Sequence, residues 1–211
     1  MDVSIPVDEG LACLMGWYVA EGSYNKKSVQ VIFTLSCKEG DVANKIVKLL
    51  DNIGVHSKIH DYSHRGAIAV VASSKMLGCV LEDLCGNGSH NKRVPIEIMG
   101  NSKLRNAFIE AYWQGDGNDA GRFTRASTVS NELAHGLRML AMMDGKVTTI
   151  GNRNNGKSYE VFHCKDAPHR FMEETEDGCW VMVKSIDETM YDGKVYNLEV
   201  QENNTYLVDG L

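Results

Sequence analysis

Two acidic residues, Glu21 and Asp116, are the side chains whose setting most directly suggests chemistry. Each ends a segment of helical character and is followed by a glycine, in the stretches LMGWYVAEG (14–22) and IEAYWQGDG (109–117). We expect both glycines to adopt the left-handed conformation that ends many helices. An acid at a helix C-terminus opposes the helix dipole, so finding this arrangement twice argues against two ordinary surface helices. Two carboxylates held side by side repel unless a cation lies near them, and Mg²⁺ suits oxygen ligands with open water positions.

Small residues in the same two stretches indicate how the acids would meet. Gly16 and Ala20 lie four positions apart, and so do Ala111 and Gly115. Residues at this spacing share one face of a helix, and facing strips of small side chains let two backbones approach closely. We therefore expect the two helices to pack together and to carry both acids to the same end. Two amphipathic helices with ordinary acidic ends are the alternative.

The composition is that of a globular protein, with 43% hydrophobic and 24% charged residues in 211. Apolar runs are too short to span a bilayer, and the first residues lack a signal-peptide pattern. Six scattered cysteines without a Cys-x-x-Cys pair predict reduced thiols and no zinc site. We expect an intracellular protein that is not secreted and has no membrane partner, located in the cytoplasm or wherever its target resides.

The net charge of −6 is unevenly distributed. Residues 172–211 contain ten acidic residues against two lysines, a net charge of −8, so the rest of the chain carries +2. A nucleic-acid partner would therefore have to be bound by residues 1–171, because binding requires clustered cations. The acidic segment is expected to be a separate region.

Hydrophobic periodicity predicts a duplicated series of helices and strands, with the two acids 95 residues apart. In the first copy, Ser36 is the expected N-cap of the second helix, and Gly22–Asn25 is the expected turn before the first strand. The expected elements of the first copy are helix 10–20, strand 25–34, helix 36–53, strands 55–62 and 67–73, and helix 74–84. Those of the second copy are helix 105–115, strand 121–129, helix 130–143, and strands 146–151 and 157–164.

The paired stretches and their separation resemble the double-motif (dodecapeptide) LAGLIDADG homing endonucleases of the intein-associated type, over nearly the whole chain. The resemblance implies an α+β fold of two pseudo-symmetric αββαββα units, which form a monomeric saddle on the major groove of double-stranded DNA. The expected domains are a first LAGLIDADG half (1–95), a second half (96–171) and an acidic β-rich segment (172–211). That last segment is expected to be a remnant of an intein (Hint) splicing domain.

The resemblance also implies a metal site built from Glu21 and Asp116, with the backbone carbonyls of Ala20 and Gly115 completing the ligand sets. The expected cofactor is Mg²⁺, which would activate water and stabilise the leaving 3′ oxygen. The expected target is a long, non-palindromic double-stranded site, because the duplication is asymmetric.

A basic residue beside the active centre is expected in the stretch HNKRVP (90–95), which resembles the family at the same place. Lys92 is the candidate there, stabilising charge on the phosphate or polarising the attacking water. Arg93 is the alternative. Lys165 is the topological candidate in the second half.

DNA contacts are expected from polar side chains on the predicted strands and hairpins, since Arg and Lys pair with guanine and Asn and Gln with adenine. These candidates are Lys26, Lys27, Gln30, Lys58, His60, Arg65, Arg122, Arg125, Arg153, Asn155 and Lys157.

The C-terminal region resembles the C-terminal splicing block of inteins, with strands expected at 180–186 and 194–200 around a turn at 191–193. Asn197 and Asn204 stand where that block commonly has Asp and His. No terminal His-Asn and no N-terminal nucleophile segment is found, so we expect that the chain does not splice alone.

Three functions are consistent with these patterns. The first is a Mg²⁺-dependent, site-specific endonuclease that makes a staggered double-strand break by phosphodiester hydrolysis. The second is a non-cleaving nucleic-acid-binding module of the maturase or regulator type. The third is an intein fragment that splices only in trans.

Overall fold

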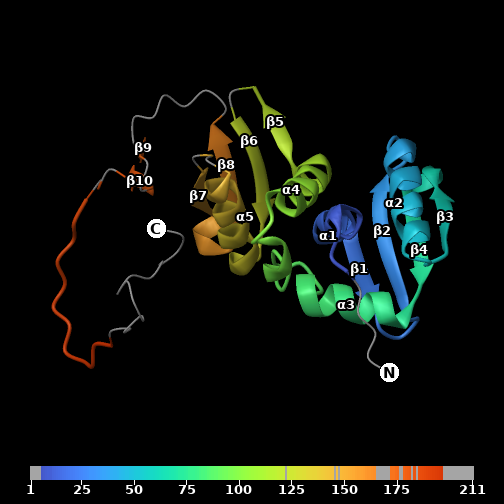
Figure 1. Cartoon of the computed structure of the whole chain (residues 1–211), viewed down its shortest axis with the longest axis horizontal. Helices are drawn as coiled ribbons and strands as arrows, with labels where there is room; N and C mark the ends of the chain where they lie inside the picture. Colours follow the sequence, from blue (N-terminus) through green and yellow to red (C-terminus); the bar gives the residue numbers. More distant parts are fainter. Residues whose placement is uncertain are drawn as a thin grey trace.

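The computed structural model describes residues 6–121, 123–144, 146, 148–164, 172–175, 178–181, 183 and 185–196. Its elements follow the duplicated order expected from the sequence (Figure 1). The first unit contains α1 (Glu9–Glu21), β1 (Gly22–Asn25), β2 (Gln30–Ser36), α2 (Gly40–Asn52), β3 (Ser57–Tyr62), β4 (Ala67–Ser73) and α3 (Lys75–Cys85). The second contains α4 (Ser102–Asp116), β5 (Asn118–Ala120), β6 (Phe123–Thr128), α5 (Asn131–Met143), β7 (Thr148–Arg153) and β8 (Ser158–Cys164). Short 3₁₀ turns lie at Ser63–Arg65, Ile96–Ile98 and Asn154–Gly156.

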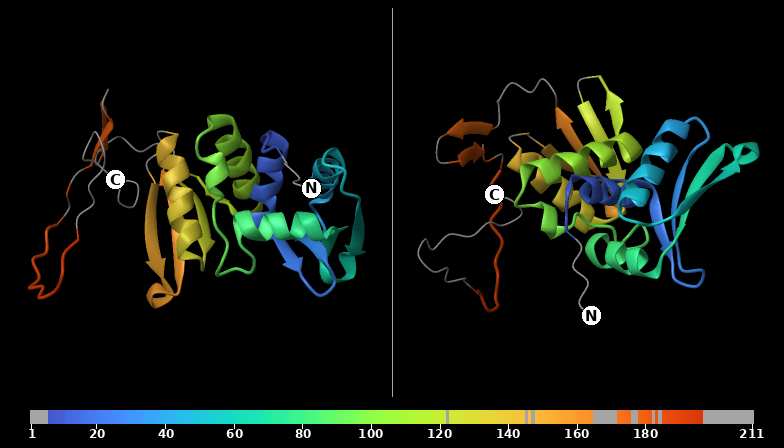
Figure 2. Two further views of the ribbon diagram at one scale, coloured as in Figure 1. Left: turned by 60° about the horizontal axis from the view of Figure 1, so that its bottom comes forward. Right: turned by 45° about the vertical axis from the view of Figure 1, so that its right-hand side comes forward.

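Each unit contains one four-stranded antiparallel sheet, and the two sheets have the same topology. The strand order is β1-β2-β4-β3 in the first and β5-β6-β8-β7 in the second. The α1–α4 pair lies between the two sheets, with α2 beside the first and α5 beside the second (Figures 1 and 2). The mixed architecture and its pseudo-symmetry are as expected. The helix expected to end the second unit lies outside the described residues.

One face of each sheet is buried under the helices, because alternate strand residues point to opposite faces. In the first sheet, Val31 and Phe33 of β2 and Val70 of β4 are fully buried, and in the second sheet Ala126 and Val161 are buried. In each strand, the residues that alternate with these buried ones point to the opposite face of the sheet, which is called the open face below.

The α1–α4 contact is as close as the small-residue spacing predicts. A Cβ on Gly16 would lie 2.3 Å from the backbone oxygen of Phe108 and 2.9 Å from Cβ of Ala111. At the other end of the contact, a Cβ on Gly115 would lie 2.7 Å from Cβ of Ala20. The two strips of small residues therefore face one another and leave no room for larger side chains.

Gly22 and Gly117, the glycines after the two acids, are not left-handed as expected. Their φ angles are −94° and −78°, so both continue into extended chain. Glycine is required for a steric reason: a Cβ on Gly22 would lie 2.6 Å from Cα of Tyr18, and one on Gly117 2.1 Å from the carbonyl oxygen of Trp113.

Two further local predictions were wrong. Gly22–Asn25 is strand β1 and not a turn, since the turn occupies residues 26–29 and includes Val29 with a φ of 58°. Ser36 ends β2 and does not cap α2, whose N-cap is Glu39. The Glu39 carboxylate nevertheless accepts a hydrogen bond from the Ser36 N–H at 2.7 Å, so half of the expected capping box is present.

In the C-terminal region, β9 (Met172–Thr175) and β10 (Gly178–Val181) form an antiparallel pair. The strand expected at 180–186 overlaps β10 only to Val181, and the described residues 183, 185 and 186 are not strand. The strand expected at 194–200 is absent at 194–196, and its remainder lies outside the described residues. The splicing-domain remnant thus stays a prediction. Among the residues described above, no helix combines the length and apolar character needed to cross a membrane.

The closeness of the helix contact can be tested by adding a single methyl group. Gly16→Ala should lower the free energy of unfolding by about 1–3 kcal/mol although alanine favours helix, because its Cβ would displace the backbone of α4. Gly40→Ala is the matched control, since no atom lies within 4 Å of a Cβ at that helical glycine. Urea unfolding of both variants measures the difference, and equal stability of the two would contradict the proposed contact.

Candidate active site

The crossing of α1 and α4 brings Glu21 and Asp116 to the same end of the helix pair. Each is the last residue of its helix. A Cβ on Gly115 would lie 3.4 Å from Cγ of Glu21, so the Glu21 side chain rests against the last turn of α4. The acids therefore meet only because small residues let the two helix ends approach.

Burial makes both acids hard to ionise, and the charge of Asp116 adds to this effect at Glu21. Burial raises the pKa of Glu21, and together with the smaller effects of the neighbouring carboxylates of Asp116 and Glu39 it brings this pKa to about 7. Asp116 keeps an open side towards solvent, yet its surroundings desolvate the carboxylate and raise its pKa to about 6, against an opposing effect of Lys92. A site with these properties takes up either protons or a cation.

Lys92 is the basic residue beside this pair. Its side chain is only 5% exposed, and its Nζ donates a hydrogen bond to the backbone carbonyl of Tyr18 and lies 3.4 Å from the centre of the Tyr18 ring. Burial lowers the pKa of Lys92 to about 7, while Cys85 and Asp116 act in the opposite direction. The lysine is thus poised to exchange a proton near neutral pH.

The segment after α3 holds Lys92 by bonds to both halves of the protein. The Lys92 carbonyl accepts a hydrogen bond at 2.6 Å from the Ser130 hydroxyl, which also caps α5, and the Arg93 N–H donates to the Cys85 carbonyl. The Arg93 guanidinium donates to the carbonyls of Leu84 and Asp83, so it secures the segment to α3. Lys92, and not Arg93, lines the cavity described below.

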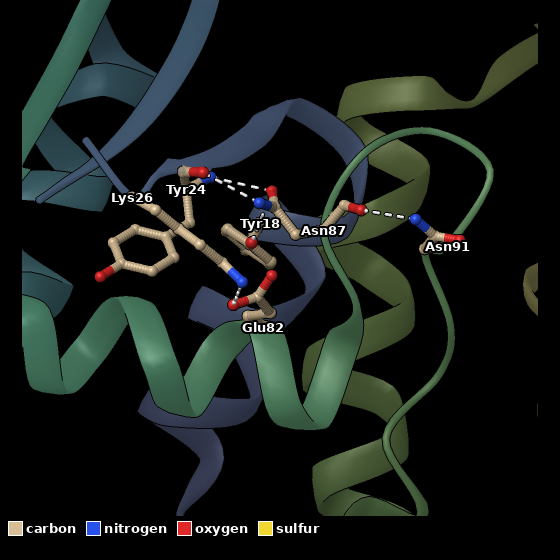
Figure 3. Close-up of polar contacts among 6 residues, drawn as sticks. All are labelled: Tyr18, Tyr24, Lys26, Glu82, Asn87 and Asn91. Atoms are coloured by element: carbon tan, nitrogen blue, oxygen red, sulfur yellow. Dashed lines mark hydrogen bonds and ion pairs between the residues drawn. The ribbon is translucent and has the colours of Figure 1, made fainter. Parts of the chain in front are cut away.

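Asn87 connects this segment to the end of α1 and to β1, a role that the sequence did not reveal. Its Oδ1 accepts hydrogen bonds from the Tyr24 N–H at 3.0 Å and the Tyr18 hydroxyl at 3.3 Å, and its Nδ2 donates to the Tyr24 carbonyl at 2.9 Å (Figure 3). The Asn91 amide donates to the Asn87 carbonyl at 3.1 Å. The sequence signal for this role is the asparagine in Gly-Asn-Gly (86–88), which follows the helix expected at 74–84.

A cavity of about 430 Å³ opens beside the helix ends. Asp116 and Lys92 line it together with Ala20 and Gly22 at the end of α1, and hydroxyl residues of the second half complete its wall. The cavity is large enough for a phosphate group with bound water, and residues from the ends of both helices line it.

The residues present fit a divalent cation. Two carboxylates with raised pKa lie close together, and the nearest ammonium group is held against Tyr18. The carbonyls of Ala20 and Gly115 belong to the last helical turns, where carbonyl groups lack intrahelical partners. Within the described residues, no three His, Cys, Asp or Glu side chains gather as ligands. Water, these carbonyls and a phosphate oxygen would therefore complete the coordination, as Mg²⁺ permits.

The expected DNA-binding residues of the first half lie around the open face of its sheet. Gln30, Lys58 and His60 share that face, because their partners in the ladders alternate with the buried residues. Arg65 lies in the exposed 3₁₀ turn between β3 and β4, and Lys27 lies in the β1–β2 turn. Lys26 lies in the same turn rather than in a strand, and its Nζ is 2.9 Å from the Glu82 carboxylate of α3 (Figure 3).

In the second half, Arg125 of β6 and Arg153 of β7 lie on the open face of the sheet. Asn155 and Lys157 are exposed in the β7–β8 hairpin loop, where Asn154 and Asn155 have positive φ angles of 51° and 57°. Arg122 and Lys165 lie outside the described residues.

Residues 8–80 match the family model of the LAGLIDADG-like domain. This match assigns residues 8–80 to the LAGLIDADG family. In fold it is similar to the homing endonuclease I-DmoI in complex with DNA and Mn, with a TM-score of 0.57 and 18% identity over 74% of this chain and 89% of that one. It is also similar to the N-terminal LAGLIDADG domain of DUF199/WhiA, with a TM-score of 0.52 and 12% identity over 75% and 78% of the two chains.

Curated relatives of this chain are much longer proteins. It is 28% identical over 263 residues to a DNA polymerase of Thermococcus sp. (strain GE8), covering 98% of this chain and 15% of that protein. It is 31% identical over 160 residues to the replication factor C small subunit of Methanocaldococcus jannaschii, covering 68% and 9%. The chain therefore spans only a small part of each relative.

The raised pKa of Glu21 predicts that the stability of the metal-free protein falls as pH rises. Because the pKa of Glu21 is raised in the folded state, that state binds a proton more tightly, and the free energy of unfolding falls as pH rises from about 4.5 to about 7. Glu21→Gln removes the buried charge, so it should be more stable than the unsubstituted protein by about 1–2 kcal/mol at pH 8, with little difference at pH 5.

Urea unfolding in EDTA at the two pH values measures this effect. Glu9→Gln, at the exposed start of the same helix, is the control and should leave the pH dependence unchanged. Destabilisation by Glu21→Gln at pH 8 would show that the carboxylate is stabilised by protein contacts and not strained by burial.

Proposed function

We propose that this LAGLIDADG chain is a divalent-metal-dependent DNA endonuclease that makes a staggered break in both strands of a long site. The observation that supports this most strongly is the pair of carboxylates at the ends of the two crossing helices, half-buried Glu21 and solvent-accessible Asp116. A purely structural helix end would not need two acids whose pKa values are raised towards neutrality.

Glu21 and Asp116 would hold the metal, with Mg²⁺ as the preferred ion because oxygen donors and water make up its site. When bound, such an ion supplies an activated water and stabilises the leaving 3′ oxygen. The carbonyls of Ala20 and Gly115 would orient the ion between the helix ends. Each acid belongs to one half of the protein, so each half would cut one strand of the DNA.

Lys92 would act on the phosphate or on the attacking water from the wall of the same cavity. With a pKa of about 7, its amine either carries a positive charge beside the phosphate or accepts a proton from water. Its bond to the Tyr18 carbonyl keeps Nζ at the end of α1. The corresponding role in the second half would fall to Lys165, the candidate named from the sequence.

The open faces of the two sheets would bind double-stranded DNA in the major groove, which is wide enough to admit β-ribbons. Both sheets belong to one chain and carry different residues, so we infer a monomer that binds a non-palindromic site. Similarity over 98% of this chain to 15% of a DNA polymerase supports an element embedded in a host protein, such as an intein. The acidic C-terminal segment would be its splicing-domain remnant.

A nucleic-acid-binding module without cleavage, of the maturase or regulator type, is the second candidate, because the polar residues of the open faces would bind DNA without a metal. It predicts specific binding that needs neither acid. Only a cleavage assay distinguishes the endonuclease from the non-cleaving module, because both would bind DNA through the same open faces.

Cleavage of a plasmid library with randomised sites tests the proposal. Mg²⁺ should support staggered cuts in one sequence and EDTA should abolish them, while Glu21→Gln and Asp116→Asn should each lower the rate at least about 100-fold. Lys92→Met should lower it about 100- to 10,000-fold with little change in binding. Glu9→Gln, on the opposite end of α1, should cut normally. Tight, specific binding without cutting in any divalent metal would favour the non-cleaving module.

A further inference from the structure

Three charged side chains form a compact cluster on the open face of the second sheet. Glu160 lies in the middle of β8, with Arg125 on β6 and Arg153 on β7 at diagonal positions on either side. Arg125 pairs with Phe162, two residues after Glu160, and Arg153 pairs with Ser158, two residues before it. All three therefore share the face opposite to the fully buried Val161.

Each oxygen of the Glu160 carboxylate contacts a different arginine. Nε and Nη2 of Arg153 both donate to Oε2, at 3.0 and 2.5 Å, and Nη1 of Arg125 lies 3.6 Å from Oε1. The Glu160 side chain is 12% exposed, whereas those of Arg125 and Arg153 are 46% and 63% exposed. The carboxylate is thus covered by two guanidinium groups that remain open to a ligand.

The neighbours of Glu160 across the ladders are small. Ser127 lies opposite it on β6 and Gly151 on β7. A Cβ on Gly151 would lie 3.4 Å from the ring of Phe162, so a larger residue there would crowd the face beside the carboxylate. The diagonal arginines can therefore reach Glu160 from both sides.

A carboxylate in the centre of a DNA-binding face opposes phosphate binding, so its presence requires a compensating benefit. Arginine has five N–H donors and loses considerable rotamer freedom when it is fixed in one geometry. Glu160 holds both arginines before any ligand arrives and uses only part of their donors. The remaining donors suit the O6 and N7 acceptors of guanine in the major groove.

The first sheet carries a different set at the equivalent positions. Ala69 is the third residue of β4, as Glu160 is the third residue of β8, so it occupies the equivalent position. The residues at its two diagonal positions are Ile32 on β2, which pairs with Val71, and Tyr62 on β3, which pairs with Ala67. Ile32, Ala69 and Tyr62 thus replace the charged residues with apolar and aromatic ones. The two sheets therefore present different side chains at equivalent positions of their open faces.

We propose that Arg125, Glu160 and Arg153 form a base-reading cluster that selects guanine at two positions of the half-site under the second sheet. The arginines contact the bases, and Glu160 is the positioning residue that holds them. The equivalent positions of the first sheet favour thymine, whose methyl group suits the apolar side chain of Ile32. This inference rests on the proposed DNA binding by the open faces.

Selection of bound duplexes from a randomised library in Ca²⁺, followed by sequencing, tests the cluster. The full chain should enrich guanine at two separate positions of one half-site. Arg125→Ala and Arg153→Ala should each lower the preference at one of these positions roughly ten-fold or more. Glu160→Gln should weaken the preference at both positions together while total DNA affinity stays equal or rises, because one negative charge is lost.

Glu110→Gln, an exposed charge-matched change on α4, is the control and should retain both guanine preferences. Thermal unfolding identifies any variant that is not folded, and only folded variants are compared. Unchanged preferences in the two arginine variants, or a fall in affinity with intact preferences in Glu160→Gln, would overturn the inference. Absence of any selected sequence with the unsubstituted chain would instead contradict the proposed DNA-binding function.

Discussion

The backbone contact between α1 and α4 is the constraint on which the rest of the structure depends. Gly16 and Ala20 on one helix meet Ala111 and Gly115 on the other, and any added Cβ would collide with the facing helix. Because the helices also end at this contact, it places Glu21 beside Asp116 and sets one sheet on each side of the pair (Figure 2). The position of the candidate active site is therefore a direct consequence of helix packing, and it does not depend on a flexible loop.

That position has an electrostatic cost which a cation would relieve. Burial raises the pKa values of Glu21 and Asp116, repulsion by Asp116 adds to the rise at Glu21, and burial lowers the pKa of Lys92 to about 7. All three groups consequently change charge close to neutral pH, as expected of groups that exchange protons or bind metal. Asn87 and Ser130 hold the Lys92 segment by long-range hydrogen bonds, so the protein fixes the base and the acids relative to one another. Specificity for the DNA sequence would come from the open faces of the sheets and not from these acids and Lys92.

The sequence predicted the features that depend on local spacing. The helix contact, the duplicated order of elements and the meeting of two acids all follow from residues three to four positions apart or from a repeat length. Features that depend on distant contacts were missed: Asn87 bonds to the backbone of Tyr24, 63 residues away, and Glu160 gains its role only from strand register. The sequence analysis singled out Gly22 and Gly117 but gave the wrong reason for them. Their φ angles are not left-handed, and glycine is needed because a Cβ would collide with the preceding turn of the helix. Lys165 and Arg122 lie outside the described residues and stay predictions.

The most direct test of this account is the effect of a divalent metal on thermal unfolding at pH 8. Mn²⁺ or Mg²⁺ should raise the unfolding temperature of the unsubstituted protein, and the rise should be much smaller at pH 5, where protons occupy Glu21 and Asp116. Glu21→Gln should abolish most of the metal effect, whereas Glu9→Gln should retain it. An equal rise in all three proteins, or none in any of them at millimolar metal, would contradict the claim that the crossing helices build a metal site.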